Sequence, residues 1–241
     1  MRLLHFPLSY GAWHPIAKAR LVLAALLLLL APAGPLAAQK AASPPPRLIL
    51  ALGDSLTAGY MLPANQSFPA QLEAALLKEG RAVKVHNGGV SGDTSAQGRA
   101  RLQWVLSGLP KKPDVAIVAL GANDMLRGQP VAQMETNIEA IVAELRKQNI
   151  EVVLAGMLAA PNLGKAYAGP YNAAFPAIAR RQGALLYPFF MEGVAANPRL
   201  LLDDQMHPNR EGVAVMVRGI LPTVRLALDK SAARAPASAR R

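Results

Sequence analysis

The 241-residue sequence contains no cysteine. It therefore excludes disulfides, a thiol nucleophile, a metal held by cysteine and a lipid anchor on cysteine. Aromatic residues make up only 5% of the chain and charged residues 17%, whereas 52% of the residues are hydrophobic. This composition is typical of a globular protein with a substantial core, and it excludes disorder over most of the chain.

A clustered basic surface is also lacking, although the formal net charge is +11. Residues 1–38 and 229–241 each carry a net charge of +3, which leaves +5 scattered over the rest of the chain. Binding to nucleic acid would require basic residues gathered on one face and interleaved with aromatic residues. The pattern favours a solvated basic surface and no nucleic-acid partner. A nucleic-acid binder is the alternative, and a steep salt dependence of binding would reveal it.

The longest apolar run near the start, residues 21–31, is too short to span a bilayer but has the length of a signal-peptide core. Basic residues precede this run and small residues follow it. The sequence therefore predicts a signal peptide over residues 1–38, with an uncleaved membrane anchor as the alternative. We expect a proline-rich linker over residues 39–46. The protein is then periplasmic or secreted, without a stable membrane anchor after cleavage.

Apolar segments of strand length alternate with helical segments over residues 47–228. The strands are expected at residues 47–52, 82–86, 115–120, 151–157 and 184–189. Helices are expected at residues 67–79, after 95, and at 131–147, 171–181 and 208–228. Such alternation predicts an α/β fold with a five-stranded parallel sheet, helices on both faces and the flavodoxin-like strand order 2-1-3-4-5. Residues 229–241 are expected to form a disordered basic tail.

The first predicted strand runs directly into Gly53, Asp54 and Ser55. Its unbroken apolar sequence, residues 48–52, is typical of a strand covered on both faces. Ser55 would then lie at the carboxyl end of the strand, where open α/β sheets bind their ligands, and it is a candidate nucleophile. Two alternatives are that Asp54 and Ser55 only cap the next helix, or that the turn holds a phosphate or flavin in a non-enzymatic module.

Three candidate residues follow the first three strands. Ser55, Gly92 and Asn123 would meet at one edge of the sheet, because the predicted order places strand one between strands two and three. Attack by Ser55 on an acyl carbon creates an oxyanion, which needs hydrogen-bond donors already in place. Gly92 and Ser55 can offer backbone N–H groups, and Asn123 can offer its side-chain amide.

A base for Ser55 can be sought among four histidines. Two lie in the predicted signal peptide, and His86 lies within a predicted strand, where a half-buried structural role is expected. His207 remains, with Asp204 three residues before it and able to orient its ring. Asp203 is an alternative partner for His207, and a further alternative is that the pair only caps the last helix.

These residues lie in four short motifs that together resemble the conserved blocks of the SGNH, or GDSL, hydrolase family. The motifs are Gly-Asp-Ser-Leu at 53–56, Ser-Gly-Asp-Thr-Ser at 91–95, Gly-Ala-Asn-Asp at 121–124 and Asp-Gln-Met-His-Pro-Asn at 204–209. Within the family, the sequence resembles the bacterial periplasmic acyl-CoA thioesterases, lysophospholipases and arylesterases. Ala122 departs from the thioesterase pattern, which has a second glycine there, but the asparagine is retained.

The resemblance implies a three-layer α/β/α hydrolase domain over residues 47–228. It assigns Ser55 as nucleophile, His207 as base oriented by Asp204, and Ser55, Gly92 and Asn123 as oxyanion donors. It also implies neither a metal nor an organic cofactor. The expected activity is that of a serine esterase or thioesterase acting on small acyl esters or thioesters, lipids among them. The choice between ester and thioester, and the oligomeric state, stay open.

The stretch after the fourth predicted strand is the expected acyl wall of the site. Residues 158–171 are rich in Ala, Leu, Pro and Gly, and the strand before them neighbours the third strand in the predicted order. We expect Leu158, Leu163 and Tyr167 to contact substrate there. The glycines and prolines make this irregular stretch a candidate lid.

Overall fold

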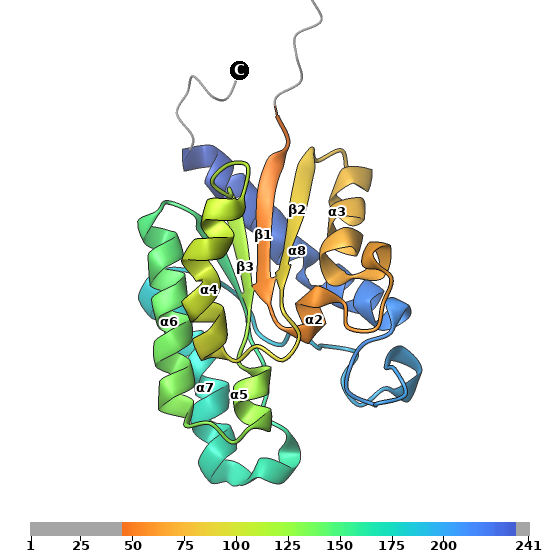
Figure 1. Cartoon of the computed structure of the whole chain (residues 1–241), viewed down its shortest axis with the longest axis vertical. Helices are drawn as coiled ribbons and strands as arrows, with labels where there is room; N and C mark the ends of the chain where they lie inside the picture. Colours follow the sequence, from red (N-terminus) through yellow and green to blue (C-terminus); the bar gives the residue numbers. More distant parts are fainter. Residues whose placement is uncertain (1–44, 235–241) are drawn as a thin grey trace, which may run out of the picture. The chain divides into compact units, whose positions relative to one another are not determined.

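The computed structural model describes residues 45–234. Its five strands form one parallel sheet in the order β2-β1-β3-β4-β5, which confirms the predicted class and order. Figure 1 shows β1 between β2 and β3. The strands are β1 (Arg47–Gly53), β2 (Val83–Gly89), β3 (Val115–Ala119), β4 (Glu151–Ala155) and β5 (Leu185–Tyr187). The predicted signal peptide, most of the predicted linker and the last seven residues of the predicted tail lie outside the described residues.

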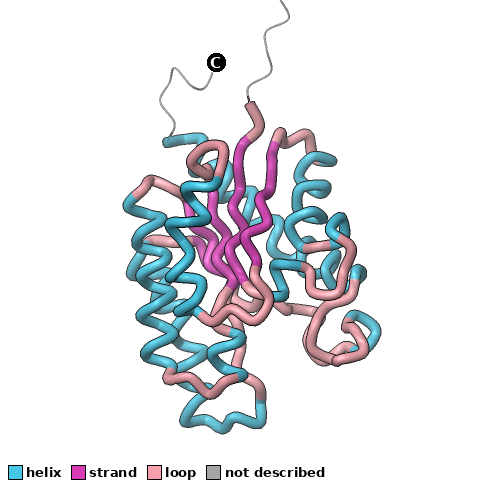
Figure 2. Tube along the Cα trace, in the orientation of Figure 1, coloured by secondary structure: helices cyan, strands magenta, loops and turns pink. Residues whose placement is uncertain are grey.

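Helices cover both faces of the sheet, with α3 and α8 on one face and α4, α6 and α7 on the other (Figures 1 and 2). The helices are α2 (Ser55–Ala58), α3 (Phe68–Lys78), α4 (Ser95–Gly108), α5 (Ala122–Leu126), α6 (Val131–Lys147), α7 (Gly164–Gln182) and α8 (Arg210–Arg234). Short 3-10 turns lie at η1 (Ala64–Gln66), η2 (Pro161–Leu163) and η3 (Pro198–Leu200). Over residues 45–234, no helix is long and apolar enough to cross a membrane.

The unbroken apolar sequence of β1 contributes side chains to two hydrophobic cores, one on each face of the sheet. Because side chains alternate across a strand, Leu48, Leu50 and Leu52 pack with α4 and α6, while Ile49 and Ala51 pack beneath α3 and α8. None of the five side chains is more than 3% exposed. This two-sided burial fixes β1 in the middle layer.

The edge strand β2 differs from its prediction in length and in the burial of one histidine. It extends to Gly89, three residues beyond the expected end, through parallel pairing with β1. Val83 and Val85 are buried, but His86 is exposed and not half-buried as expected. On an edge strand the alternate side chains have no covering layer, and His86 occupies such a position.

Helix α7 begins at Gly164, seven residues before its predicted start. The irregular stretch expected over residues 158–171 is therefore partly helical. The glycines and prolines concealed this helix, which continues through Pro170 and Pro176. Pro170 is exposed, as is Ala166 one turn earlier, so the carbonyl that loses its donor can reach water.

The last helix is also longer than predicted, and residues 229–234 are helical and not disordered. Arg81 pairs with Asp229 at 2.7 Å, and Arg47 Nη2 donates to Ser231 Oγ at 2.8 Å. Arg234 forms an ion pair with Glu151, a buried carboxylate on β4. These contacts attach the end of α8 to the sheet, so the domain extends past residue 228.

The aromatic contact between α3 and the segment after β5 provides a stability test. Phe68 is fully buried and meets Phe190 edge-to-face, with ring centroids 4.9 Å apart. We expect Phe68→Ala to lower the free energy of unfolding by about 3–5 kcal/mol, because a cavity remains in the core. Leu77→Ala, on the same helix and half exposed, should change it by less than about 0.5 kcal/mol. Equal urea midpoints for both variants would contradict this.

Candidate active site

The turn after β1 places Ser55 at the carboxyl edge of the sheet. Ser55 is the first residue of α2, and Asp54 caps that helix by accepting from the Leu56 N–H at 3.0 Å. The turn requires Gly53, because a Cβ there would lie 2.1 Å from Thr57 Oγ1 and 2.8 Å from the Ala119 carbonyl oxygen. Asp54 therefore does cap the next helix, as one alternative predicted. Ser55 does more than begin this helix, because it also contacts a residue outside the turn.

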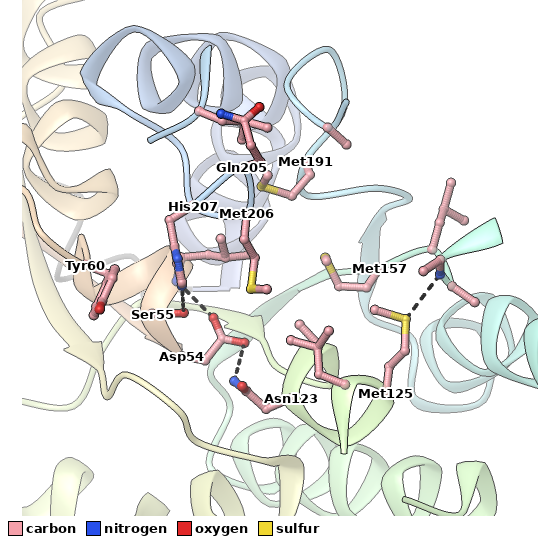
Figure 3. Close-up of a pocket in the computed structure, with 18 of the residues that line it drawn as sticks. Asp54, Ser55, Tyr60, Asn123, Met125, Met157, Met191, Gln205, Met206 and His207 are labelled. Carbon is pink, nitrogen blue, oxygen red and sulfur yellow. Dashed lines mark hydrogen bonds between the residues drawn. The ribbon is translucent and has the colours of Figure 1, made fainter. Parts of the chain in front are cut away.

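His207 bridges Ser55 and Asp204. Its Nε2 lies 2.9 Å from Ser55 Oγ (Figure 3). Its Nδ1 lies 2.6 Å from Asp204 Oδ2. The partner is Asp204 and not Asp203. A carboxylate on one ring nitrogen holds the imidazole so that the other nitrogen can take the serine proton.

The turn before His207 keeps Asp204 ionised. Its Oδ1 accepts from the backbone N–H groups of His207 and Met206, both at 2.9 Å. The His207 N–H, the His207 ring and the Met206 N–H together lower the pKa of Asp204 to about 2. Gln205 takes a positive φ of 56° at this turn. Asp204 can therefore support a positive charge on the imidazole at neutral pH.

Gly92 and Asn123 line the same cavity as Ser55, as predicted from the strand order. Asn123 Nδ2 donates to the Asp93 carbonyl at 3.0 Å and lies 3.4 Å from Asp54 Oδ2. Gly92 has φ +86°, a left-handed conformation that favours glycine. The three loops thus bring Ser55, Gly92 and Asn123 to one cavity.

Buried polar contacts hold these loops together. Arg101, on α4, pairs with Asp93 at 2.5 Å and donates to the Gly53 carbonyl at 2.9 Å. Asp124 accepts from Ser95 twice, from its N–H at 2.7 Å and from its hydroxyl at 2.6 Å. Hydrogen bonds therefore join the loops after β1, β2 and β3 and hold them in position relative to one another.

A mainly apolar cavity of about 770 Å³ opens beside Ser55. Its larger apolar lining residues are Leu56, Tyr60, Met125, Leu126, Met157, Leu158, Phe189, Met191, Leu201 and Met206. Leu158 contributes to this lining as expected, but Leu163 and Tyr167 do not. Tyr167 donates to the Gln129 carbonyl at 3.2 Å and stacks on Tyr171 instead, because α7 begins early and turns the residue away from the cavity.

Sequence reasoning missed two contributions to the site. The Tyr60 ring lies against the His207 imidazole, with centroids 4.4 Å apart (Figure 3). Its position five residues after Ser55 was the available signal. Residues 189–206 provide much of the cavity wall, but this segment has no helical or strand periodicity that would have indicated it.

The turn after β1 does not suit the alternative ligand, a phosphate or flavin phosphate. Residues 45–234 contain no group of three or more His, Asp or Glu side chains arranged to hold a metal ion. At the turn proposed as a phosphate cradle, the Asp54 carboxylate already occupies the Leu56 N–H. A negative side chain at this position opposes a phosphate or flavin phosphate.

The fold has three layers, with helices on both faces of one sheet, and Ser55, His207 and Asp204 lie at the carboxyl edge of that sheet. This combination defines a class of ester-bond hydrolases. Residues 51–215 match the model of the GDSL-like Lipase/Acylhydrolase family, and the chain belongs to this family. The resemblance seen in the four sequence motifs is thereby confirmed.

Named relatives agree with this class. The chain is 39% identical over 171 residues to an arylesterase of Vibrio mimicus, a match that covers 71% of this chain and 84% of the relative. It is 38% identical over 163 residues to thioesterase 1/protease 1/lysophospholipase L1 of Escherichia coli K12, covering 68% and 76%. The solved structure of AlinE4, an SGNH-hydrolase family esterase, has 44% identity and a TM-score of 0.65, covering 76% and 97%.

Asp54 makes stability depend on pH. The carboxyl is 2% exposed, and burial raises its pKa from 3.8 to about 6 against the opposing effects of the Leu56 N–H and His207. Because the folded-state pKa is the higher one, the folded chain binds more protons than the unfolded chain between about pH 4 and 6. The stabilisation that Asp54 contributes is fully present below about pH 4 and is lost as the pH rises through about 6.

Asp54→Asn removes this titration. Between about pH 4 and 6, the free energy of unfolding of the wild type should fall by about 3 kcal/mol relative to that of the Asp54→Asn variant. Urea unfolding of both proteins at several pH values measures the difference. A difference that stays constant with pH would contradict the prediction.

Proposed function

We propose that the protein is an exported serine esterase or thioesterase that forms an acyl-enzyme on Ser55. The observation that carries this proposal is the hydrogen-bonded series of Ser55, His207 and Asp204 at the mouth of an apolar cavity. The names of the relatives, an arylesterase and a thioesterase, support the reaction class. The basic, apolar and small-residue pattern of residues 1–38 supports export to the periplasm or the medium.

The proposed reaction begins when Ser55 Oγ attacks the acyl carbon and its proton passes to His207 Nε2. The substrate carbonyl oxygen becomes an oxyanion, which accepts hydrogen bonds from the Ser55 and Gly92 N–H groups and from Asn123. One Asn123 N–H is held by the Asp93 carbonyl at 3.0 Å, and the other makes a longer hydrogen bond to Asp54 Oδ2 at 3.4 Å. The oxyanion would take the second N–H from Asp54.

Collapse of this intermediate breaks the ester C–O or thioester C–S bond. His207 gives its proton to the leaving alcohol or thiol, and the acyl group remains on Ser55. Water then attacks the acyl-enzyme while His207 again acts as base. His207 passes that proton to Ser55 Oγ as the bond between Ser55 and the acyl carbon breaks and the carboxylic acid leaves. Asp204 stays ionised throughout and supports the imidazolium in both halves of the reaction.

Covalent labelling tests the nucleophile directly. We expect an organophosphonate ester to modify Ser55 stoichiometrically, as read from the mass of the labelled peptide, and to abolish esterase activity. Ser91 also lines the cavity, so Ser91→Ala is the matched control and should be labelled as the wild type is. Label found on any residue other than Ser55 in the wild type would refute the assignment.

The apolar cavity predicts a preference for longer acyl chains than acetate. Each buried methylene contributes about 0.8 kcal/mol, or about fourfold in kcat/KM, until the cavity ends. A series of p-nitrophenyl esters should therefore show a rise followed by a plateau. Leu158→Ala should reduce the rise, because it removes part of the lining. Tyr167→Ala, outside the lining, is the control and should leave the profile unchanged.

A profile that peaks at acetate and falls steadily would contradict the long acyl site. It would favour a small closed pocket and a role as an acetylesterase or arylesterase.

A further inference from the structure

Tyr60 contacts the His207 ring outside the hydrogen-bonded series of Ser55, His207 and Asp204. Both ring nitrogens of His207 are engaged in the ring plane, by Ser55 and by Asp204. The Tyr60 ring lies over the imidazole at 4.4 Å between centroids, with the planes inclined by 36°. We infer that Tyr60 is a positioning residue that holds His207 in line and stabilises its protonated form. This inference rests on the proposed function of Ser55 and His207.

The backbone that carries Ser55 also aims Tyr60. Helix α2 ends at Ala58 and is capped by Gly59, whose φ of +83° turns the chain. The Gly59 and Tyr60 N–H groups donate to the Ser55 carbonyl at 3.1 and 3.2 Å. A Cβ at Gly59 would lie 2.6 Å from Ser67 Cβ, so a side chain would disturb this turn. The predicted nucleophile and the ring that supports its base therefore belong to one rigid turn.

The contact becomes stronger as the reaction proceeds. An aromatic ring attracts a cation placed within about 6 Å of its centroid, and it attracts neutral imidazole less. His207 gains its positive charge when it takes the Ser55 proton, so the attraction increases on the way to the transition state and lowers the barrier. Tyr60 is 41% exposed, which moderates the effect through solvent screening.

Two carboxylates also act on His207. Asp204 bonds to Nδ1, and the buried Asp54 attracts the charged imidazole from the opposite end of the nucleophile turn. Both carboxylates remain in place when Tyr60 is replaced. A comparison among Tyr60 variants therefore isolates the contribution of the aromatic ring.

The test compares Tyr60→Leu, which removes the ring, with Tyr60→Phe, which keeps it. With p-nitrophenyl butyrate, Tyr60→Leu should lower kcat by about 3- to 10-fold. The acid limb of its kcat/KM profile should move to lower pH by about 0.5–1 unit, because the charged imidazole has lost support. Tyr60→Phe should stay within about twofold of the wild type and keep the acid limb in place. Trp104→Leu, an exposed aromatic on α4, controls for loss of an aromatic ring and should change neither quantity.

Two results would overturn the inference. If Tyr60→Leu raised KM but left kcat and the acid limb unchanged, Tyr60 would be only part of the cavity wall. If Tyr60→Phe were as impaired as Tyr60→Leu, the hydroxyl and not the ring would be responsible. Phosphonate labelling of wild-type Ser55 is read separately, so failure of the proposed nucleophile is distinguished from failure of the role of Tyr60.

Discussion

The parallel pairing of β1 with both β2 and β3 is the constraint on which the site depends. Gly53 lies opposite Gly89 in one neighbour and opposite Ala119 in the other. The three strands therefore end at nearly the same level, and each is followed by a loop that carries one predicted site residue. If β2 or β3 shifted by one residue against β1, the side chains of the shifted strand would point to the wrong core. The packing of both cores therefore also aligns the loops at the strand ends.

The base reaches this edge by a different route. His207 lies on a loop closed by the bridge between Leu201 and Pro208 and by the hydrogen bond from the Leu202 N–H to the His207 carbonyl at 2.7 Å. The three strand loops are fixed by buried polar contacts, whereas Asp203, Asp204 and neighbouring residues of this loop are exposed. The site thus combines a rigid sheet edge with a surface loop whose geometry is set by its own hydrogen bonds.

Most of the fold and the reacting groups could be predicted from the sequence because their signals are local. Alternating apolar segments indicated the strand order, and short polar motifs at strand ends indicated Ser55, Gly92 and Asn123. The Asp204–His207 spacing fits a single turn. Leu163 and Tyr167 were misplaced because the helical pattern of α7 is interrupted by Gly and Pro. The exposure of His86 could not be predicted, because it depends on which neighbours cover the edge strand. The cavity wall formed by residues 189–206 could not be predicted either, because it arises from tertiary packing and has no periodic sequence pattern.

The position of α8 has a consequence for how the chain acquires its structure during synthesis. Its apolar stripe, with Val213, Ile220 and Val224 fully buried, forms a large part of the core beneath β1 and β3. Chains emerge from the ribosome with their N-terminal part first, yet one face of this sheet lacks its cover until the last helix has been made. The two cores can consequently close at different times: the α4–α6–α7 side can close before α8 has been made, and the α3–α8 side only afterwards.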